Sequence, residues 1–165
     1  MNERFRSKAL QMAPLPEGLA PPSEWADDSG GEWSQVRRGK GAGVGRKVII
    51  VDDDRDTRVL LQFILEQEGF TVAQAPSGLR LISLLHVDRP DIILLDVMMS
   101  WINGFELCRA IKSNPAFHDI PICFISARAD PSSVKEGLEC GAAAYFVKPI
   151  DVDRLVEKIA SLTVH

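Results

Sequence analysis

The sequence predicts a doubly wound α/β domain, in which helices cover both faces of a five-stranded parallel sheet. From residue 47 onward, short apolar segments alternate regularly with amphipathic segments, and the connections between them are short. Such strict alternation calls for parallel strands, because each right-handed crossover lays its helix on one face of the sheet. The segment at 92–95 is apolar at every position, which is typical of a central strand covered on both faces.

Five strands are predicted from apolar runs, and five helices from apolar residues at helical spacing. The strands cover 48–51, 70–75, 92–95, 120–125 and 144–147. The helices cover 57–68, 78–86, 103–112, a segment from Ser133 to near Gly141, and a last segment that opens at Asp151.

Capping residues and apolar faces support these helices. Asn103 with Glu106, and Ser133 with Glu136, resemble capping boxes, and Asp54 is expected to cap the first helix rather than bind a metal. The first helix carries an apolar face of Leu60, Phe63, Ile64 and Gln67, and the last carries one of Leu155, Val156, Ile159 and Leu162.

Residues 1–46 differ from the folded domain predicted at 47–165. They combine proline, glycine and charge without sustained periodicity, so we expect a flexible, disordered extension. Trp25 and Trp33 are candidate anchors for a partner or for the folded domain. The glycines at 41–45 precede the first strand and match no phosphate-binding loop motif, which excludes a nucleotide site there.

Composition limits the class of protein. The chain has 165 residues, of which 45% are hydrophobic and 25% charged, so disorder throughout is excluded. Its net charge of -4 disfavours direct DNA binding. A signal peptide and a membrane-spanning apolar run are both missing from the sequence, which predicts a cytoplasmic location. Cys108, Cys123 and Cys140 form no metal-binding pattern and are expected to be unpaired, reduced thiols.

Polar residues follow the predicted strands at their carboxyl ends, where parallel sheets of this type bind ligands. Asp52 and Asp53 follow the first strand, Asp96 the third, Ser126 the fourth and Lys148 the fifth. If the first and third strands are neighbours, the carboxylates meet, and their repulsion raises a pKa or demands a cation. An acidic site made only of oxygen ligands suits Mg²⁺.

An aspartate beside such an ion can act as a nucleophile toward a phosphoryl group. Asp96 is the candidate acceptor. Ser126 can donate a hydrogen bond to one phosphoryl oxygen and Lys148 can form an ion pair with another, so both gain contacts on phosphorylation. Contacts that differ between two states are what move a switch.

These residues resemble the receiver domains of two-component response regulators over about residues 47–164. VIIVDDD at 48–54 is similar to the family's first strand and acidic pair, and LLDVMM at 94–99 to its acceptor strand. The Ser-Ala pair at 126–127 resembles the switch position, and YFVKP at 145–149 the last strand.

The resemblance implies a flavodoxin-like fold with strand order 2-1-3-4-5. It also implies that Mg²⁺ is held by Asp52, Asp53, Asp96 and the backbone carbonyl of Met98. A phosphohistidine on a histidine kinase or histidine phosphotransfer protein is the implied phosphoryl donor, and the domain catalyses its own phosphorylation and slow dephosphorylation without acting on other substrates.

The resemblance further implies a switch. Ser126 and Tyr145 are its implied switch residues, Lys148 the lysine of the site, and the peptide bond between Lys148 and Pro149 is implied to be cis. The face that changes lies at about 133–158, and an unknown downstream protein reads it, because no output domain is recognisable in the sequence.

One segment departs from the family pattern. The family reads MPxMDG where this chain has Met99-Ser100-Trp101-Ile102-Asn103-Gly104, so a proline and an acid are lost. We expect the loop to be slightly looser and the N–H of Ser100 to be free.

Two other functions stay open. One is a docking module that binds its partner regardless of phosphorylation, against which the intact acidic site argues. The other is an aspartate-nucleophile phosphatase, which needs an acid two residues after the nucleophile, where this chain has Met98. A monomer or a weak dimer is expected, and no contact with a membrane.

Overall fold

The computed structural model describes residues 45–100 and 102–163. Within them, five strands form one parallel sheet in the order β2-β1-β3-β4-β5, which confirms the predicted doubly wound fold and strand order. The strands are β1 (Lys47–Val51), β2 (Thr71–Ala75), β3 (Ile92–Leu95), β4 (Ile122–Ser126) and β5 (Ala144–Val147). The helices are α2 (Arg55–Gln67), α3 (Gly78–Val87), α4 (Gly104–Ser113), α5 (Pro131–Glu139) and α6 (Val152–Leu162).

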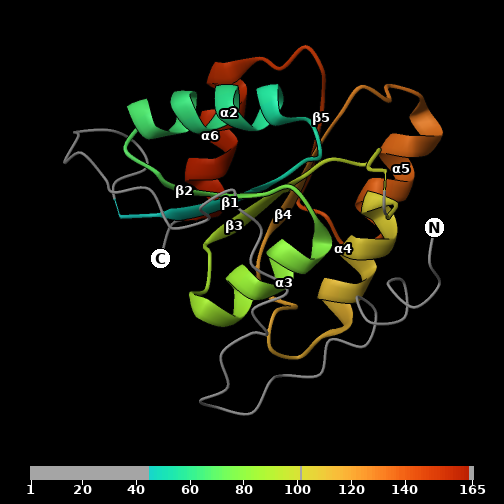
Figure 1. Cartoon of the computed structure of the whole chain (residues 1–165). Coiled ribbons are helices and arrows are strands. Elements are labelled where there is room, and N and C mark those ends of the chain that lie inside the picture. The colour runs from blue at the N-terminus through green and yellow to red at the C-terminus, as the bar shows by residue number, and fades with distance from the viewer. Residues whose placement is uncertain (1–44, 101, 164–165) are drawn as a thin grey trace.

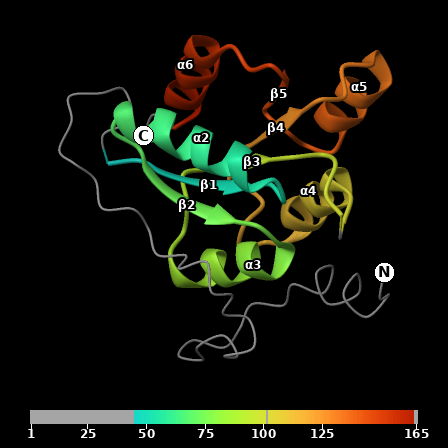
Figure 2. The ribbon, with the colours of Figure 1, turned by 45° about the horizontal axis from the view of Figure 1, so that its top comes forward.

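Helices lie on both faces of the sheet (Figures 1 and 2). One face is covered by α2 and α6, whose Leu61, Leu65, Leu155 and Ile159 pack against alternate residues of the strands. The other face is covered by α3, α4 and α5 and forms a separate, larger core. All four residues of β3 are buried, as expected of a central strand with a hydrophobic core on each side.

The caps explain where the helices begin. The side chain of Asp54 accepts a hydrogen bond from the N–H of Thr57, and Asp151 accepts one from Arg154, so both predicted caps are confirmed. Asn103 caps α4 but bonds to the N–H of Phe105. Other strand and helix ends differ from the predicted ones by a few residues, as element boundaries commonly do.

Two predictions about helices are wrong. The cap of α5 is Asp130, so Ser133 lies inside the helix, where its own N–H donates to the Asp130 carboxylate. In α2, Leu60 and Phe63 are 59% and 61% exposed, and the buried face is formed by Arg58, Leu61 and Leu65. The predicted apolar face of α2 therefore points largely to solvent.

The predicted extension, including Trp25 and Trp33, lies outside the described residues except for Gly45 and Arg46. The Arg46 guanidinium donates to the carbonyl of Ala160 in α6 at 3.0 Å, and the backbone carbonyl of Arg46 accepts from the N–H of Thr71. The folded part thus reaches at least to Arg46. Among the described residues, none of the helices is both long and apolar enough to span a bilayer.

Candidate functional site

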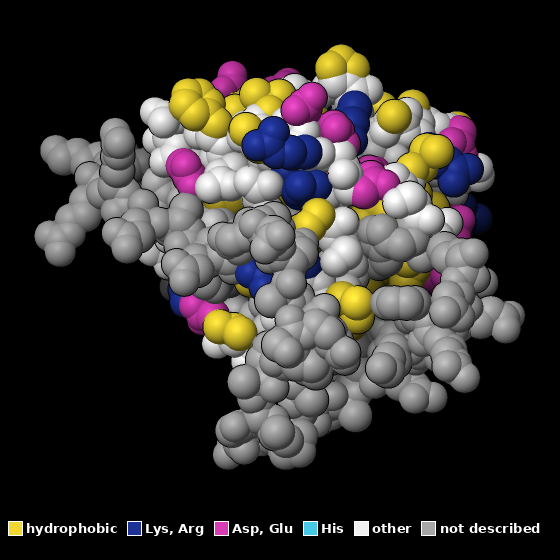
Figure 3. All heavy atoms as spheres, in the orientation of Figure 1, with side chains coloured by type: hydrophobic (Ala, Val, Ile, Leu, Met, Phe, Trp, Pro, Cys, Tyr) yellow, Lys and Arg dark blue, Asp and Glu magenta, His cyan; other side chains and the backbone are white. Residues whose placement is uncertain are grey.

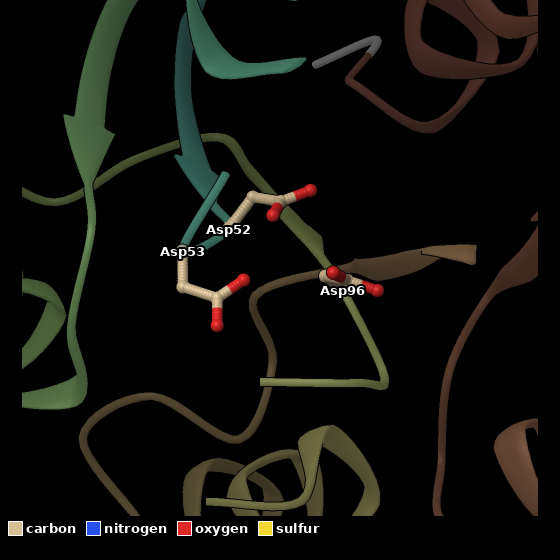
Figure 4. A group of neighbouring side chains, drawn as sticks. All are labelled: Asp52, Asp53 and Asp96. Carbon is tan, nitrogen blue, oxygen red and sulfur yellow. The ribbon is translucent and has the colours of Figure 1, made fainter. Parts of the chain in front are cut away.

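Three carboxylates meet beyond the carboxyl ends of β1 and β3. The two strands are paired with Val51 opposite Leu95, so the residues that follow them emerge side by side. Asp52, Asp53 and Asp96 each offer an oxygen within 4.8 Å of the others, and their side chains extend into one region in Figure 4. An all-oxygen set of carboxylates suits Mg²⁺, so the residues present fit this ion.

Lys148 adds a cation to this cluster. Its Nζ lies 3.3 Å from an oxygen of Asp52 and 3.9 Å from an oxygen of Asp96. The lysine follows β5 and is held by its N–H, which donates to the carbonyl of Ser126 at 2.8 Å. The peptide bond between Lys148 and Pro149 is cis, as predicted. The structure therefore brings four of the predicted site residues together.

Asp96 has an unusual protonation equilibrium. Burial and the neighbouring Asp52 carboxylate together raise its pKa from 3.8 to about 6, although Lys148 and the N–H of Met98 act in the opposite direction. Near neutral pH the Asp96 carboxylate is therefore mostly ionised, although burial and the nearby Asp52 carboxylate disfavour its negative charge. A cation bound beside it would relieve this repulsion.

This pKa gives a prediction about stability. Without metal, Asp96→Asn is expected to raise the free energy of unfolding at about pH 7.5 by roughly 1–2 kcal/mol. The folded protein holds this proton up to a pKa of about 6, above the 3.8 of the unfolded chain. The carboxylate therefore has no effect on stability below about pH 4; its destabilising effect grows between about pH 4 and pH 6 and is constant above that. Urea unfolding of both proteins across this range measures the difference, and a gap that does not change with pH would contradict it.

Asp52 is held from its backbone as well as from its side chain. The buried guanidinium of Arg58 donates to the Asp52 carbonyl at 2.7 Å and to the side-chain oxygen of Gln74 on β2 at 3.0 Å. The Asp52 carboxylate also accepts a hydrogen bond from the N–H of Asp54. These contacts fix the end of β1 and aim the carboxylate at the cluster.

Asp53 is exposed, but it is not free to rotate. The N–H of Ser100, in the loop after β3, donates to one of its carboxylate oxygens at 2.9 Å. The expectation of a free N–H at Ser100 is therefore wrong, because the missing proline leaves a donor that ties the loop to Asp53. The N–H of Met98 donates to Asp96, and its side chain is exposed. A metal-binding role for the Met98 carbonyl stays a prediction.

Gly104 closes this loop against the acceptor strand. Its N–H donates to the carbonyl of Val97 at 2.9 Å. A Cβ atom at this position would overlap the carbonyl oxygen of Asp96 and lie 2.8 Å from the Cα of Val97. Only glycine allows α4 to begin this close to the backbone of the predicted acceptor.

Ser126 and Tyr145 lie on the neighbouring strands β4 and β5. Ser126 is fully buried, and its hydroxyl accepts a hydrogen bond from the N–H of Arg128 at 3.1 Å. The hydroxyl of Tyr145 donates to the carbonyl of the same Arg128 at 2.8 Å. Both predicted switch residues are thus hydrogen-bonded to the backbone of the same loop residue, Arg128.

The sequence from 48 to 160 matches the family model of the response regulator receiver domain. The chain belongs to this family. The receiver domain is 42% identical over 115 residues to the transcriptional regulatory protein CseB of Streptomyces coelicolor, which covers 70% of this chain and 48% of that protein. It is 36% identical over 116 residues to the response regulator MprA of Mycobacterium ulcerans, covering 70% and 49%. The chain therefore spans about half the length of these relatives.

Solved structures give the same answer for the fold. A response regulator described as putative, from Chloroflexus aurantiacus, superposes with a TM-score of 0.69 at 29% identity, covering 73% of this chain and 98% of that one. The receiver domain of a signal transduction histidine kinase from Syntrophus aciditrophicus gives 0.67 at 31% identity, covering 72% and 90%. Both support the predicted flavodoxin-like receiver fold.

The roles of Arg58 and Gly104 were missed from the sequence, and so was the acceptor of the Ser100 N–H. Arg58 was not considered because a charged residue in a helix is usually exposed, and Gly104 and Ser100 act through backbone atoms of a loop. The sequence signal for Arg58 was its position one helical turn before Leu61 and two turns before Leu65, on the same face of the helix.

Proposed function

We propose that this receiver domain is a phosphoacceptor switch, in which Asp96 receives a phosphoryl group from a phosphohistidine of a sensor kinase or phosphotransfer protein. The observation that carries the proposal is the position of Asp96, buried beside the carboxylate of Asp52 and the ammonium group of Lys148. A bound Mg²⁺, held by Asp52, Asp53, Asp96 and the carbonyl of Met98, would neutralise charge on the transferring oxygens.

Asp96, Lys148 and Ser126 have separate roles in the proposed phosphoryl transfer. An Asp96 oxygen forms the bond to phosphorus as the bond from phosphorus to the histidine nitrogen breaks, and the histidine, whose other ring nitrogen already carries a proton, leaves as neutral imidazole. Lys148, which reaches both Asp52 and Asp96 without the phosphoryl group, pairs with one of its oxygens afterwards. Ser126 donates its hydroxyl hydrogen to another.

The proposed switch depends on the hydrogen bond that Ser126 loses on phosphorylation. A hydroxyl that turns toward the phosphoryl group no longer accepts from the N–H of Arg128, and the loop that also receives the hydroxyl of Tyr145 is released. Tyr145 lies beside α5, so the change reaches the face formed by α5, β5 and α6. We propose that a downstream protein, or a further domain of a longer protein, reads this face.

The donor protein is proposed to dock over α2. Val59, Leu60 and Phe63 are all exposed on this helix, which begins directly after Asp52 and Asp53. In Figure 3, apolar side chains gather at the surface over α2, among charged ones. Exposed apolar side chains grouped on one face mark contact sites, and this face adjoins the acceptor that a histidine must reach.

The test is the mass of the intact protein after incubation with magnesium and a small-molecule phosphodonor such as phosphoramidate. The natural chain is expected to gain one phosphoryl group, and Asp96→Asn none, because the amide cannot form the acyl phosphate. Removal of magnesium with a chelator is expected to slow the gain at least tenfold.

A matched control is Asp91→Asn, at the opposite end of the same strand, which should be phosphorylated as the natural chain is. No adduct on the natural chain, under conditions that modify another receiver domain, would favour a module that docks regardless of phosphorylation. A cytoplasmic location and the flexible extension at 1–46 stay predictions.

A further inference from the structure

Two thiols from different helices meet in the core beside α4 and α5. Cys108 lies in the middle of α4 and is completely buried, whereas Cys140 is the C-cap of α5 and 7% exposed. The Cys108 thiol is 3.5 Å from the carbonyl oxygen of Cys140, and that of Cys140 is 3.0 Å from the carbonyl oxygen of Gly137. The side chain of Cys108 therefore lies directly against Cys140.

The third cysteine provides an internal contrast. Cys123 lies on β4 and packs into the core on the opposite face of the sheet, under α2 and α6. Burial alone raises the pKa of its thiol to about 12, so it has almost no thiolate at neutral pH. All three cysteines are free thiols in the structure, as the sequence predicts. Only Cys108 and Cys140 among them are neighbours.

We propose that Cys108 and Cys140 are an oxidisable thiol pair, which a peroxide converts into a disulfide that joins α4 to the end of α5. The 3.5 Å contact of the Cys108 sulfur with the Cys140 carbonyl oxygen places the two residues side by side, and a disulfide forms only between residues that already lie this close together. The pair is separate from the carboxylate site and does not depend on the proposed phosphorylation.

The two thiols differ in pKa and in exposure, and this difference decides which of them reacts with the peroxide first. The neighbouring Cys108 and the positive charge of Arg109 lower the pKa of the Cys140 thiol, and the neighbouring Cys140 and burial raise the pKa of the Cys108 thiol. The thiolate of Cys140, the more exposed of the two, therefore attacks the peroxide. The O–O bond breaks, Cys140 becomes a sulfenic acid, and one water leaves.

The second step closes the bridge. The Cys108 sulfur attacks the sulfur of the sulfenic acid, the S–O bond breaks, and the proton of the Cys108 thiol leaves with the hydroxide as a second water. Two thiols are oxidised to one disulfide, and one peroxide is reduced to two waters. Cys108 thus protects Cys140 from further oxidation, because it traps the sulfenic acid at once.

The bridge would add a covalent link beside a weak one. α4 and α5 are also joined at this side by the exposed ion pair of Arg109 and Glu136, at 2.9 Å. Gly137, whose carbonyl accepts the Cys140 thiol, lies against the ring of Tyr145. The oxidised protein would therefore hold α5 in place next to the predicted switch residue.

The experiment uses the reduced full chain, folded, with hydrogen peroxide as the oxidant. After removal of peroxide, the protein is denatured, alkylated and mapped by mass spectrometry. We expect the loss of two hydrogen atoms from the intact mass, alkylation of one thiol instead of three, and a peptide linking Cys108 to Cys140. Dithiothreitol should restore all three thiols.

Several results would overturn the proposal. They are oxygen added to Cys140 without a disulfide, a bridge to Cys123 or between two chains, and three thiols that survive peroxide which oxidises glutathione in the same tube. These outcomes are read on the natural chain, so no variant has to fold.

Variants sharpen the assignment of the two steps. Cys123→Ala should form the bridge as the natural chain does. Cys108→Ala should stop at the sulfenic acid of Cys140, which dimedone captures, and a dimedone adduct on the natural chain should be at least tenfold weaker. Equal capture in both proteins would contradict the role of Cys108.

Discussion

Replacing Gly104 with alanine is expected to lower the free energy of unfolding by at least about 3 kcal/mol. The added methyl group would overlap the carbonyl oxygen of Asp96 and crowd the Cα of Val97. Both are backbone atoms of the segment that leaves a fully buried strand, so neither can move aside without disturbing β3. Because the same segment carries Asp96, we also expect the rate of phosphorylation from a small-molecule donor to fall at least tenfold.

Gly137→Ala is the matched control for that substitution. Its added Cβ would lie 2.8 Å from the ring of Tyr145 and 3.2 Å from that of Phe124, so it crowds side chains instead of backbone atoms. Alanine also gains about 1 kcal/mol over glycine inside a helix, which offsets the crowding. Urea unfolding should place this variant within about 1 kcal/mol of the natural chain. Equal losses in the two variants would show that backbone crowding at Gly104 is not the cause.

The second large effect is expected at Arg58, where methionine should reduce the free energy of unfolding by about 2–4 kcal/mol. The buried guanidinium satisfies the carbonyl of Asp52 and the side chain of Gln74, and both would lose this donor. Methionine keeps much of the apolar stem, so the loss reports mainly on the hydrogen bonds. Since Arg58 fixes the end of β1, we also expect weaker magnesium binding, measured by calorimetry on the folded variant.

Arg55→Met tests the specificity of this effect. Arg55 is exposed on the first turn of the same helix, and its replacement should change the free energy of unfolding by less than about 0.5 kcal/mol. Arg58→Lys should recover only part of the loss, because an ammonium group cannot serve both acceptors with the planar geometry of a guanidinium. Full stability in Arg58→Met would mean that water replaces the lost donor.

The fold could be predicted because its pattern is repeated along the chain. Strand β3 was predicted with its observed bounds, since four apolar residues between turn residues have one interpretation. The buried face of α2 was not predicted correctly, because Leu60 and Phe63 satisfy helical spacing as well as Leu61 and Leu65 do. The choice between the two faces depends on Arg58, whose burial is stabilised by acceptors on other segments.

The site, like the fold, could be predicted only in part. Asp52, Asp96 and Lys148 could be located because strand order alone brings the ends of their strands together. The hydrogen bonds to Arg128 from Ser126 and Tyr145 depend on the conformation of one loop, and no sequence pattern specifies it. Topology therefore predicted which residues meet, and loop geometry decided what each one bonds to.

The hydrogen bond from Ser100 to Asp53 has a consequence for magnesium affinity. An exposed aspartate normally loses rotational freedom when it binds an ion, and that loss weakens binding. Here the N–H of Ser100 already holds the Asp53 carboxylate, which lies beside Asp52 and Asp96. Part of the entropy loss would thus occur on folding, so the serine that replaces the family's proline would preorganise Asp53 for the proposed ion.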